Sequence, residues 1–203
     1  MKKFIQILSI VAFVTLGTES QAQGLNTTLL GHLPYSQTLS EVRGASHNGR
    51  EYALVGVHNG FSIVDVTSPA SPTEVFFEAG ANSIWRDPFF HNGHAYCVTE
   101  GGGGMLIVDM NPLPSSTSLN SMLYTGSTYN ISAAHNMFIE SATNKAYLFG
   151  TNDIDGAIIL DISNPMNPVE LGIWNDHYIH DGFVRGDTLW AGCLEDGSFL
   201  VDV

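Results

Sequence analysis

The chain has 203 residues and a formal net charge of −13, with 13% charged and 44% hydrophobic residues. Such an acidic protein repels phosphate backbones and anionic lipid, which argues against nucleic acid and a membrane surface as partners. The hydrophobic fraction and the length predict a folded domain with one sizeable core rather than a disordered chain.

Residues 1–22 have the features of an export signal. Lys2 and Lys3 supply positive charge, residues 4–17 are mostly apolar, and small residues stand at positions 20 and 22. The apolar run is too short for a stable membrane span. We therefore expect cleavage after Ala22, an uncleaved anchor being the alternative, and a secreted or cell-surface mature chain of residues 23–203 without a transmembrane span.

An apolar segment at residues 25–33 follows the signal. Its part from Thr28 to Leu33 resembles residues 170–174, which belong to a predicted outer strand further along the chain. In ring-shaped repeat folds an N-terminal strand often completes the last unit. Residues 25–33 are therefore a candidate ring-closing strand.

A turn glycine followed five residues later by an aspartate then recurs four times. The segments are Gly60–Asp65, Gly104–Asp109, Gly156–Asp161 and Gly197–Asp202. The aspartates at 65, 109, 161 and 202 lie 44, 52 and 41 residues apart, which is the period of a propeller blade. The apolar run inside each segment favours a strand that is buried on both faces.

The rest of each unit can be predicted around this segment. Asn48-Gly49 and Asn92-Gly93 are strong hairpin signals between a first, polar strand and a second, apolar one. Prolines follow the first and third aspartates at offsets of four and seven residues, and they suit the turn that leads to an outer strand. The aspartate side chain can accept backbone N–H bonds from that turn. The predicted units are residues 40–78, 85–124, 134–174 and 179–203.

These elements predict an all-β fold, a β-propeller of four-stranded antiparallel blades with about four blades present. The sequence given stops after the fourth aspartate, where an outer strand should follow. Either residues 25–33 supply that strand and four blades close the ring, or this is the N-terminal part of a larger propeller. We favour the larger propeller. Cys97 and Cys193 fall in non-neighbouring units, so we expect both to be buried and unbonded.

The segments IVDVTSPASP, IVDMNPLP and ILDISNPMNP resemble the LVIVD repeat. Together with EYALVGVHNG, WRD, AHN and IHDGFVRGDTLWAG, they resemble the choice-of-anchor B family of secreted bacterial proteins over residues 40–203. This resemblance implies an exported propeller whose surface anchor varies between members and lies outside this chain. It implies no settled activity.

The first strand of each unit carries the candidate site. Glu41, Asp87, Asn136 and Asp181 align in the four units, and the residue before three of them is Arg86, His135 or His180. Because innermost strands converge at the mouth of a propeller channel, these side chains should form one ring. The ring could bind a metal through imidazoles and carboxylates, or an anionic or sugar ligand through Arg86 and the histidines. Alternatively, it is structural and hydrogen-bonds neighbouring blades.

Three other patterns are weaker. His177 and His180 are three residues apart, so on a strand they point to opposite faces and make poor zinc co-ligands. Residues 152–156 resemble the start of a calcium loop but fit a hairpin better, because no bidentate glutamate follows. The glycines at 101–104 lack the helix and lysine of a phosphate loop.

The function that we expect from the sequence is an exported, non-enzymatic binding or scaffold propeller that recognises an extracellular protein or carbohydrate. Exposed aromatic residues would serve such a module, with Trp85 and Trp174 as candidates. The alternative is a metal-assisted hydrolase or lyase that uses His135, His180, Asp87 and Asp181 at the channel. No cofactor, metal or catalytic residue is assigned by the sequence.

Overall fold

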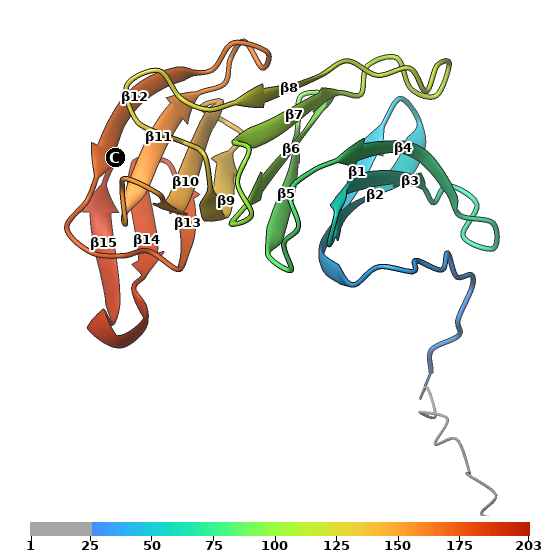
Figure 1. The fold of residues 1–203 in the computed structure, drawn as a ribbon, viewed down its shortest axis with the longest axis horizontal. Helices are drawn as coiled ribbons and strands as arrows, with labels where there is room; N and C mark the ends of the chain where they lie inside the picture. Colours follow the sequence, from blue (N-terminus) through green and yellow to red (C-terminus); the bar gives the residue numbers. More distant parts are fainter. Residues whose placement is uncertain (1–25) are drawn as a thin grey trace, which may run out of the picture.

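A computed structural model describes residues 26–203 as four antiparallel β-sheets that follow one another in chain order around an arc (Figure 1). The export signal and the proposed cleavage site lie outside the described residues. No helix in residues 26–203 is long and apolar enough to cross a membrane. The fold is the predicted all-β arrangement of propeller blades.

Each sheet is one blade, and its strands are hydrogen-bonded in sequence order. The first blade contains β1 (Leu39–His47), β2 (Arg50–Val57), β3 (Gly60–Asp65) and β4 (Thr73–Ala79). The second blade contains β5 (Arg86–His91), β6 (His94–Thr99), β7 (Met105–Asp109) and β8 (Ser121–Tyr124).

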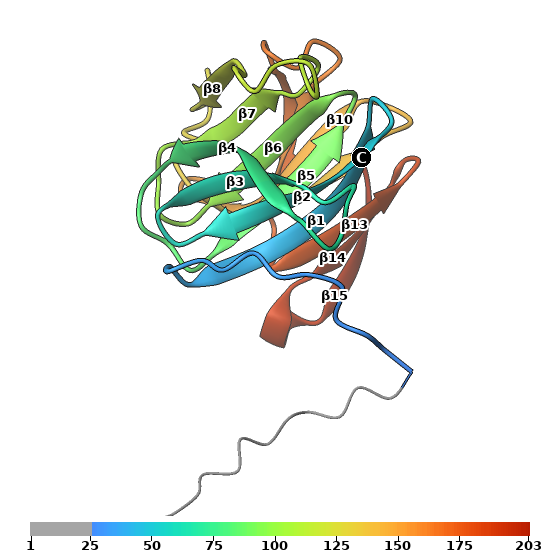
Figure 2. The ribbon, with the colours of Figure 1, turned by 90° about the vertical axis from the view of Figure 1, so that its right-hand side faces the viewer.

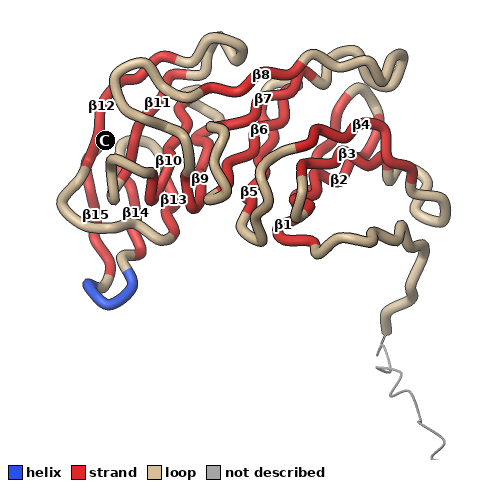
Figure 3. The backbone as a smooth tube through the Cα atoms, viewed as in Figure 1, coloured by secondary structure: helices blue, strands red, loops and turns tan. Residues whose placement is uncertain are grey.

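The other two blades repeat this order, but the last has one strand fewer. The third blade contains β9 (Ala134–Glu140), β10 (Lys145–Thr151), β11 (Ala157–Asp161) and β12 (Val169–Trp174). The fourth blade contains β13 (Asp181–Arg185), β14 (Thr188–Gly192) and β15 (Ser198–Asp202). A single helical turn, Leu194–Asp196, lies between β14 and β15 and is drawn blue in Figure 3.

The turns have the chemistry that the sequence predicts. Asn48-Gly49 and Asn92-Gly93 both have positive φ at the two central residues of their hairpins. The carboxylates of Asp65, Asp109 and Asp161 each accept a bond from the backbone N–H two residues further on, at 2.8 to 2.9 Å. The predicted aspartate turn is therefore confirmed in three blades.

The core lies between blades rather than inside any one of them. Apolar clusters join blades one and two around Ile63 and Val108, blades two and three around Ile107 and Leu148, and blades three and four around Phe149 and Leu189. A blade is only one sheet thick and can bury its faces only against its neighbours. Cys97 and Cys193 are free and buried in these clusters, as predicted.

Residues 26–38 contain no strand and do not pair with the three-stranded fourth blade. They lie against the free face of the first blade instead (Figure 2), where Leu33 and Tyr35 pack on Val55 and Val64. The Tyr35 hydroxyl is 2.8 Å from Ser62 Oγ on β3. In this structure the candidate ring-closing segment therefore packs on blade one, at the opposite end of the arc from the three-stranded sheet that it was expected to complete.

Candidate functional site

The innermost strands of the four blades meet around one hollow. β1 contacts β5, β5 contacts β9, and β9 contacts β13. At this junction lies a cavity of about 510 Å³, here called the channel hollow. It is lined by all seven residues that the sequence aligns: Glu41, Arg86, Asp87, His135, Asn136, His180 and Asp181.

Strand position explains this convergence. Arg86 and Asp87 open β5, His135 and Asn136 are the second and third residues of β9, and Asp181 opens β13. Residues near the start of the innermost strand of each blade lie at the same end of these strands, where the four strands converge. Alignment of the repeat units was therefore sufficient to predict that these residues from four blades lie close together.

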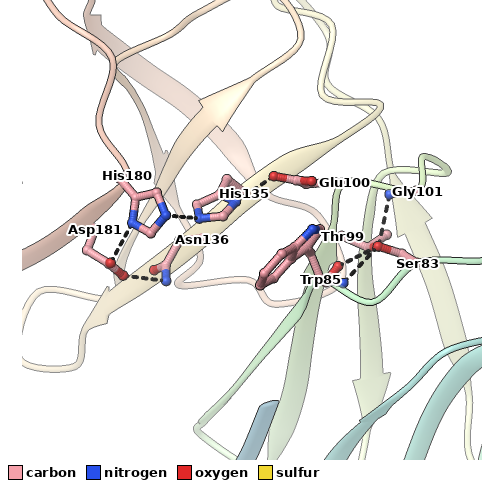
Figure 4. A network of polar contacts seen from close by, with 9 residues as sticks. All are labelled: Ser83, Trp85, Thr99, Glu100, Gly101, His135, Asn136, His180 and Asp181. Atoms are coloured by element: carbon pink, nitrogen blue, oxygen red, sulfur yellow. Dashed lines mark hydrogen bonds and ion pairs between the residues drawn. The ribbon is translucent and has the colours of Figure 1, made fainter. Parts of the chain in front are cut away.

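A chain of polar contacts crosses the boundary between blades three and four (Figure 4). His135 Nε2 is 2.9 Å from His180 Nε2, and His180 Nδ1 is 2.8 Å from Asp181 Oδ2. The other carboxylate oxygen of Asp181 accepts a bond of 2.7 Å from Asn136 Nδ2. At the far end, His135 Nδ1 is 2.5 Å from Glu100 Oε1.

Glu100 was not among the residues predicted from the sequence. It follows β6, just before the glycines at 101–104, and no equivalent acidic residue recurs in the other units. Only the contact with His135 identifies it. Sequence reasoning based on a repeat finds residues that recur, and this one does not.

Asp87 is the buried carboxyl of the hollow, with 5% of its surface exposed. Loss of hydration raises its pKa to about 7, although a backbone bond from Met137 and the positive charge of Arg43 both oppose the shift. The Met137 N–H donates to Asp87 Oδ2 at 2.9 Å, so Asp87 also joins blades two and three. This residue therefore fits the structural interpretation and also places a titratable group in the hollow.

Arg86 lines the hollow, but its guanidinium is used elsewhere. Its Nε donates to the Val57 carbonyl at 2.8 Å, and a terminal nitrogen donates to the Ala81 carbonyl. Burial lowers the pKa of this guanidinium. Because these donors already hold the first and second blades together, Arg86 gives little support to binding of an anionic ligand.

Trp85 adds an aromatic surface at the edge of the hollow. Trp85 is 54% exposed, and the centroid of its ring lies 6.2 Å from that of the His135 ring, with the two rings tilted against each other. Its backbone is nevertheless fixed, because Thr99 Oγ1 and Ser83 Oγ both donate to the Trp85 carbonyl at 2.9 Å. The hollow thus combines an exposed indole, on a hydrogen-bonded backbone, with acidic and amide side chains.

The weaker sequence candidates lie outside the hollow. His177 stacks on Phe199 at 4.1 Å and contacts Asp196, so it is not beside His180. Trp174 packs against the same Phe199 and does not line the hollow. Asn152 and Asp153 accept backbone N–H bonds from residues 133 and 130, as turn-stabilising side chains do. Within residues 26–203 no group of three or more His, Cys, Asp or Glu side chains is placed to hold a metal ion.

Comparison with known families agrees with the repeat. The LVIVD repeat matches residues 50–77, which cover β2, β3 and most of β4 in the first blade, and residues 152–176, which cover β11 and β12 of the third. No curated protein matches the chain. The two matches lie at equivalent positions in their blades, since each includes the Gly-to-Asp strand and all or most of the outer strand that follows.

Proposed function

We propose that this LVIVD-repeat protein is a non-enzymatic binding propeller that takes an extracellular carbohydrate, or a protein segment, in the channel hollow. The observation that carries the proposal is the exposed indole of Trp85 beside a cavity lined by polar side chains from four blades. Ligand sites commonly combine a concave apolar surface with a few fixed polar groups.

A carbohydrate suits the chemistry of this hollow best. The apolar C–H face of a sugar ring can pack on the exposed indole, and sugar hydroxyls can donate to the carboxylates of Glu41 and Asp181. The guanidinium of Arg86 is bonded to carbonyls, so a phosphate or sulfate ligand would meet carboxylates without a free cation. A neutral sugar avoids that repulsion.

The test is a calorimetric titration of the protein with a panel of neutral oligosaccharides. We expect Trp85→Ala to weaken binding at least tenfold, because the ring supplies the contact surface. Trp190→Ala is the matched control, since Trp190 is an exposed tryptophan on β14 away from the hollow. Equal affinities for wild type and Trp85→Ala would contradict the proposal.

A metal-assisted hydrolase or lyase is the second candidate. The paired histidines and the raised pKa of Asp87 favour it, because a carboxyl that titrates near neutral pH suits general acid–base chemistry. Turnover of a glycan by the wild type that is lost in Asp87→Asn would replace the binding proposal with this one.

We further propose that the chain is an exported member of the choice-of-anchor B family. The charged and apolar residues of positions 1–22 support export, and the LVIVD matches support the family at the level of the repeat. Expression of the full chain in a bacterial host tests the export: the exported protein should begin at Gln23, and a product that keeps Met1 in the cytoplasm would contradict it.

A further inference from the structure

The hydrogen-bond partners of His135 and His180 determine where their protons lie. Each Nδ1 faces a carboxylate, Glu100 Oε1 at 2.5 Å and Asp181 Oδ2 at 2.8 Å. A carboxylate only accepts hydrogen bonds, so each Nδ1 carries the hydrogen. In a neutral imidazole the other nitrogen, Nε2, is then a lone-pair acceptor.

The two Nε2 atoms are therefore both acceptors, and they lie 2.9 Å apart. Two lone pairs at that distance need a positive centre between them, either one shared proton or a metal ion. Histidines that bind metals commonly donate their second N–H to a carboxylate, which fixes the ring and the tautomer. Both rings have such a carboxylate partner at Nδ1.

We propose that His135 and His180 together bind a divalent transition-metal ion of the zinc class through their Nε2 atoms, at the edge of the channel hollow. Tetrahedral zinc with nitrogen ligands at about 2.0–2.1 Å places two such nitrogens about 3.3 Å apart. The two Nε2 atoms therefore need to separate by a few tenths of an ångström, and the rings need to turn from their present tilt of 50°. The side chain of His180 is 40% exposed, which leaves it room to make that turn.

Acidic side chains around the two histidines favour a cation, and the two imidazoles would occupy only part of its coordination sphere. Glu41, Asp87 and Asp181 line the hollow, and Glu100 contacts His135 from outside it. Like imidazole, these oxygen groups attract divalent cations. Since no third His, Cys, Asp or Glu of residues 26–203 is placed to complete the site, water or a ligand donor atom would fill the remaining positions. A sugar hydroxyl in the hollow is such a donor.

The experiment uses the metal alone, so that its result is separate from carbohydrate binding. Zinc is titrated into the metal-free protein in competition with a chromophoric chelator, and cobalt is used as a spectroscopic substitute. We expect one equivalent per chain and visible cobalt bands of a nitrogen-ligated ion. His135→Ala and His180→Ala should each weaken binding at least tenfold, and His177→Ala, at the Asp196 contact outside the hollow, should leave it unchanged.

Glu100→Gln tests the role of the outer carboxylate. Loss of such a partner typically weakens metal binding by about 10–100-fold while the ligands remain. If the alanine variants do not fold, the wild type still decides the question. Paramagnetic cobalt should then broaden the NMR signals of the His135 and His180 rings before those of His177.

Zinc binding that is equal in all four variants, or broadening spread evenly over the surface histidines, would overturn the metal site. Trp85→Ala should keep the metal while it loses the sugar. The two proposals can therefore fail independently.

Discussion

The second and fourth blades contain the same strand motif in different surroundings. β7 and β15 each follow a glycine and end on an aspartate, so Ile107 and Leu200 occupy equivalent positions. Ile107 is fully buried, whereas Leu200 is 72% exposed. The paired residues on the preceding strand differ likewise: Tyr96, opposite Ile107, is buried, and Trp190, opposite Leu200, is exposed.

The difference comes from the neighbours and not from the strands. The second blade lies between two others and packs on both, whereas the described part of the fourth blade shares a core with the third blade alone. An apolar strand in a propeller therefore stabilises the fold only where another sheet covers it. Equivalent substitutions in the two blades measure how much stability an apolar strand gains when another sheet covers it.

The largest contrast is expected from truncating the equivalent apolar residues. Ile107→Ala removes a fully buried side chain and should lower the free energy of unfolding by about 2–5 kcal/mol. Leu200→Ala changes an exposed residue and should stay within about 0.5 kcal/mol of wild type. Chemical denaturation of both variants provides the measurement. A large loss for Leu200→Ala would mean that its face is covered in solution.

The second contrast concerns the aligned carboxyls Asp87 and Asp181. The unfolded chain releases the Asp87 proton near pH 4, but burial holds it in the folded protein until a pKa of about 7. Stability from this group is therefore complete below pH 4 and is lost as the pH rises to 7, by up to about 1.4 kcal/mol per pH unit. Asp87→Asn removes the titration and should flatten that decline, as followed by urea unfolding at each pH.

Asp181→Asn is the control for this measurement. It removes a carboxylate from the same hollow, but at an exposed position. The wild-type decline in stability should persist in that variant. If the decline disappears in Asp181→Asn and persists in Asp87→Asn, the carboxyl that keeps its proton is Asp181 and not Asp87.

The smallest contrast is in the aspartate turns. Asp109 accepts a bond of 2.9 Å from the Asn111 N–H, whereas the given sequence ends one residue after Asp202, so within residues 26–203 the Asp202 carboxylate has no N–H two positions further on to accept from. Asp109→Ala should therefore cost about 1 kcal/mol, and Asp202→Ala close to nothing. Thermal unfolding of the two variants compares them. Equal losses would show that the motif stabilises through the strand and not through the turn.

Much of the fold could be predicted from local patterns. The Asn-Gly hairpins require positive φ at both central residues, and the aspartates cap their own turns, so both features depend on residues within a few positions of one another. The period of the repeat then ordered the blades. The placement of residues 26–38 could not be predicted in this way, because Leu33 and Tyr35 can pack on any free apolar sheet face.

The site was predictable in part for the same reason. Alignment of the units identified seven residues that line the channel hollow, because each unit repeats the same backbone path. It did not show that the Arg86 guanidinium turns to carbonyls of the first blade, or that Glu100 supports His135. Side-chain direction depends on donors and acceptors from other blades, and no repeat pattern records them.

The sequence by itself determined the strands, the turns and the position at which the blades present their polar residues, since these follow from short-range geometry and a regular period. Only the tertiary structure decided which equivalent strand is buried, which carboxyl keeps its proton and which two imidazoles meet. Each of these depends on what lies on the far side of a sheet. A neighbouring blade that removes water raises the pKa of Asp87 and buries Ile107, whereas no sheet of residues 26–203 covers the side chain of Leu200.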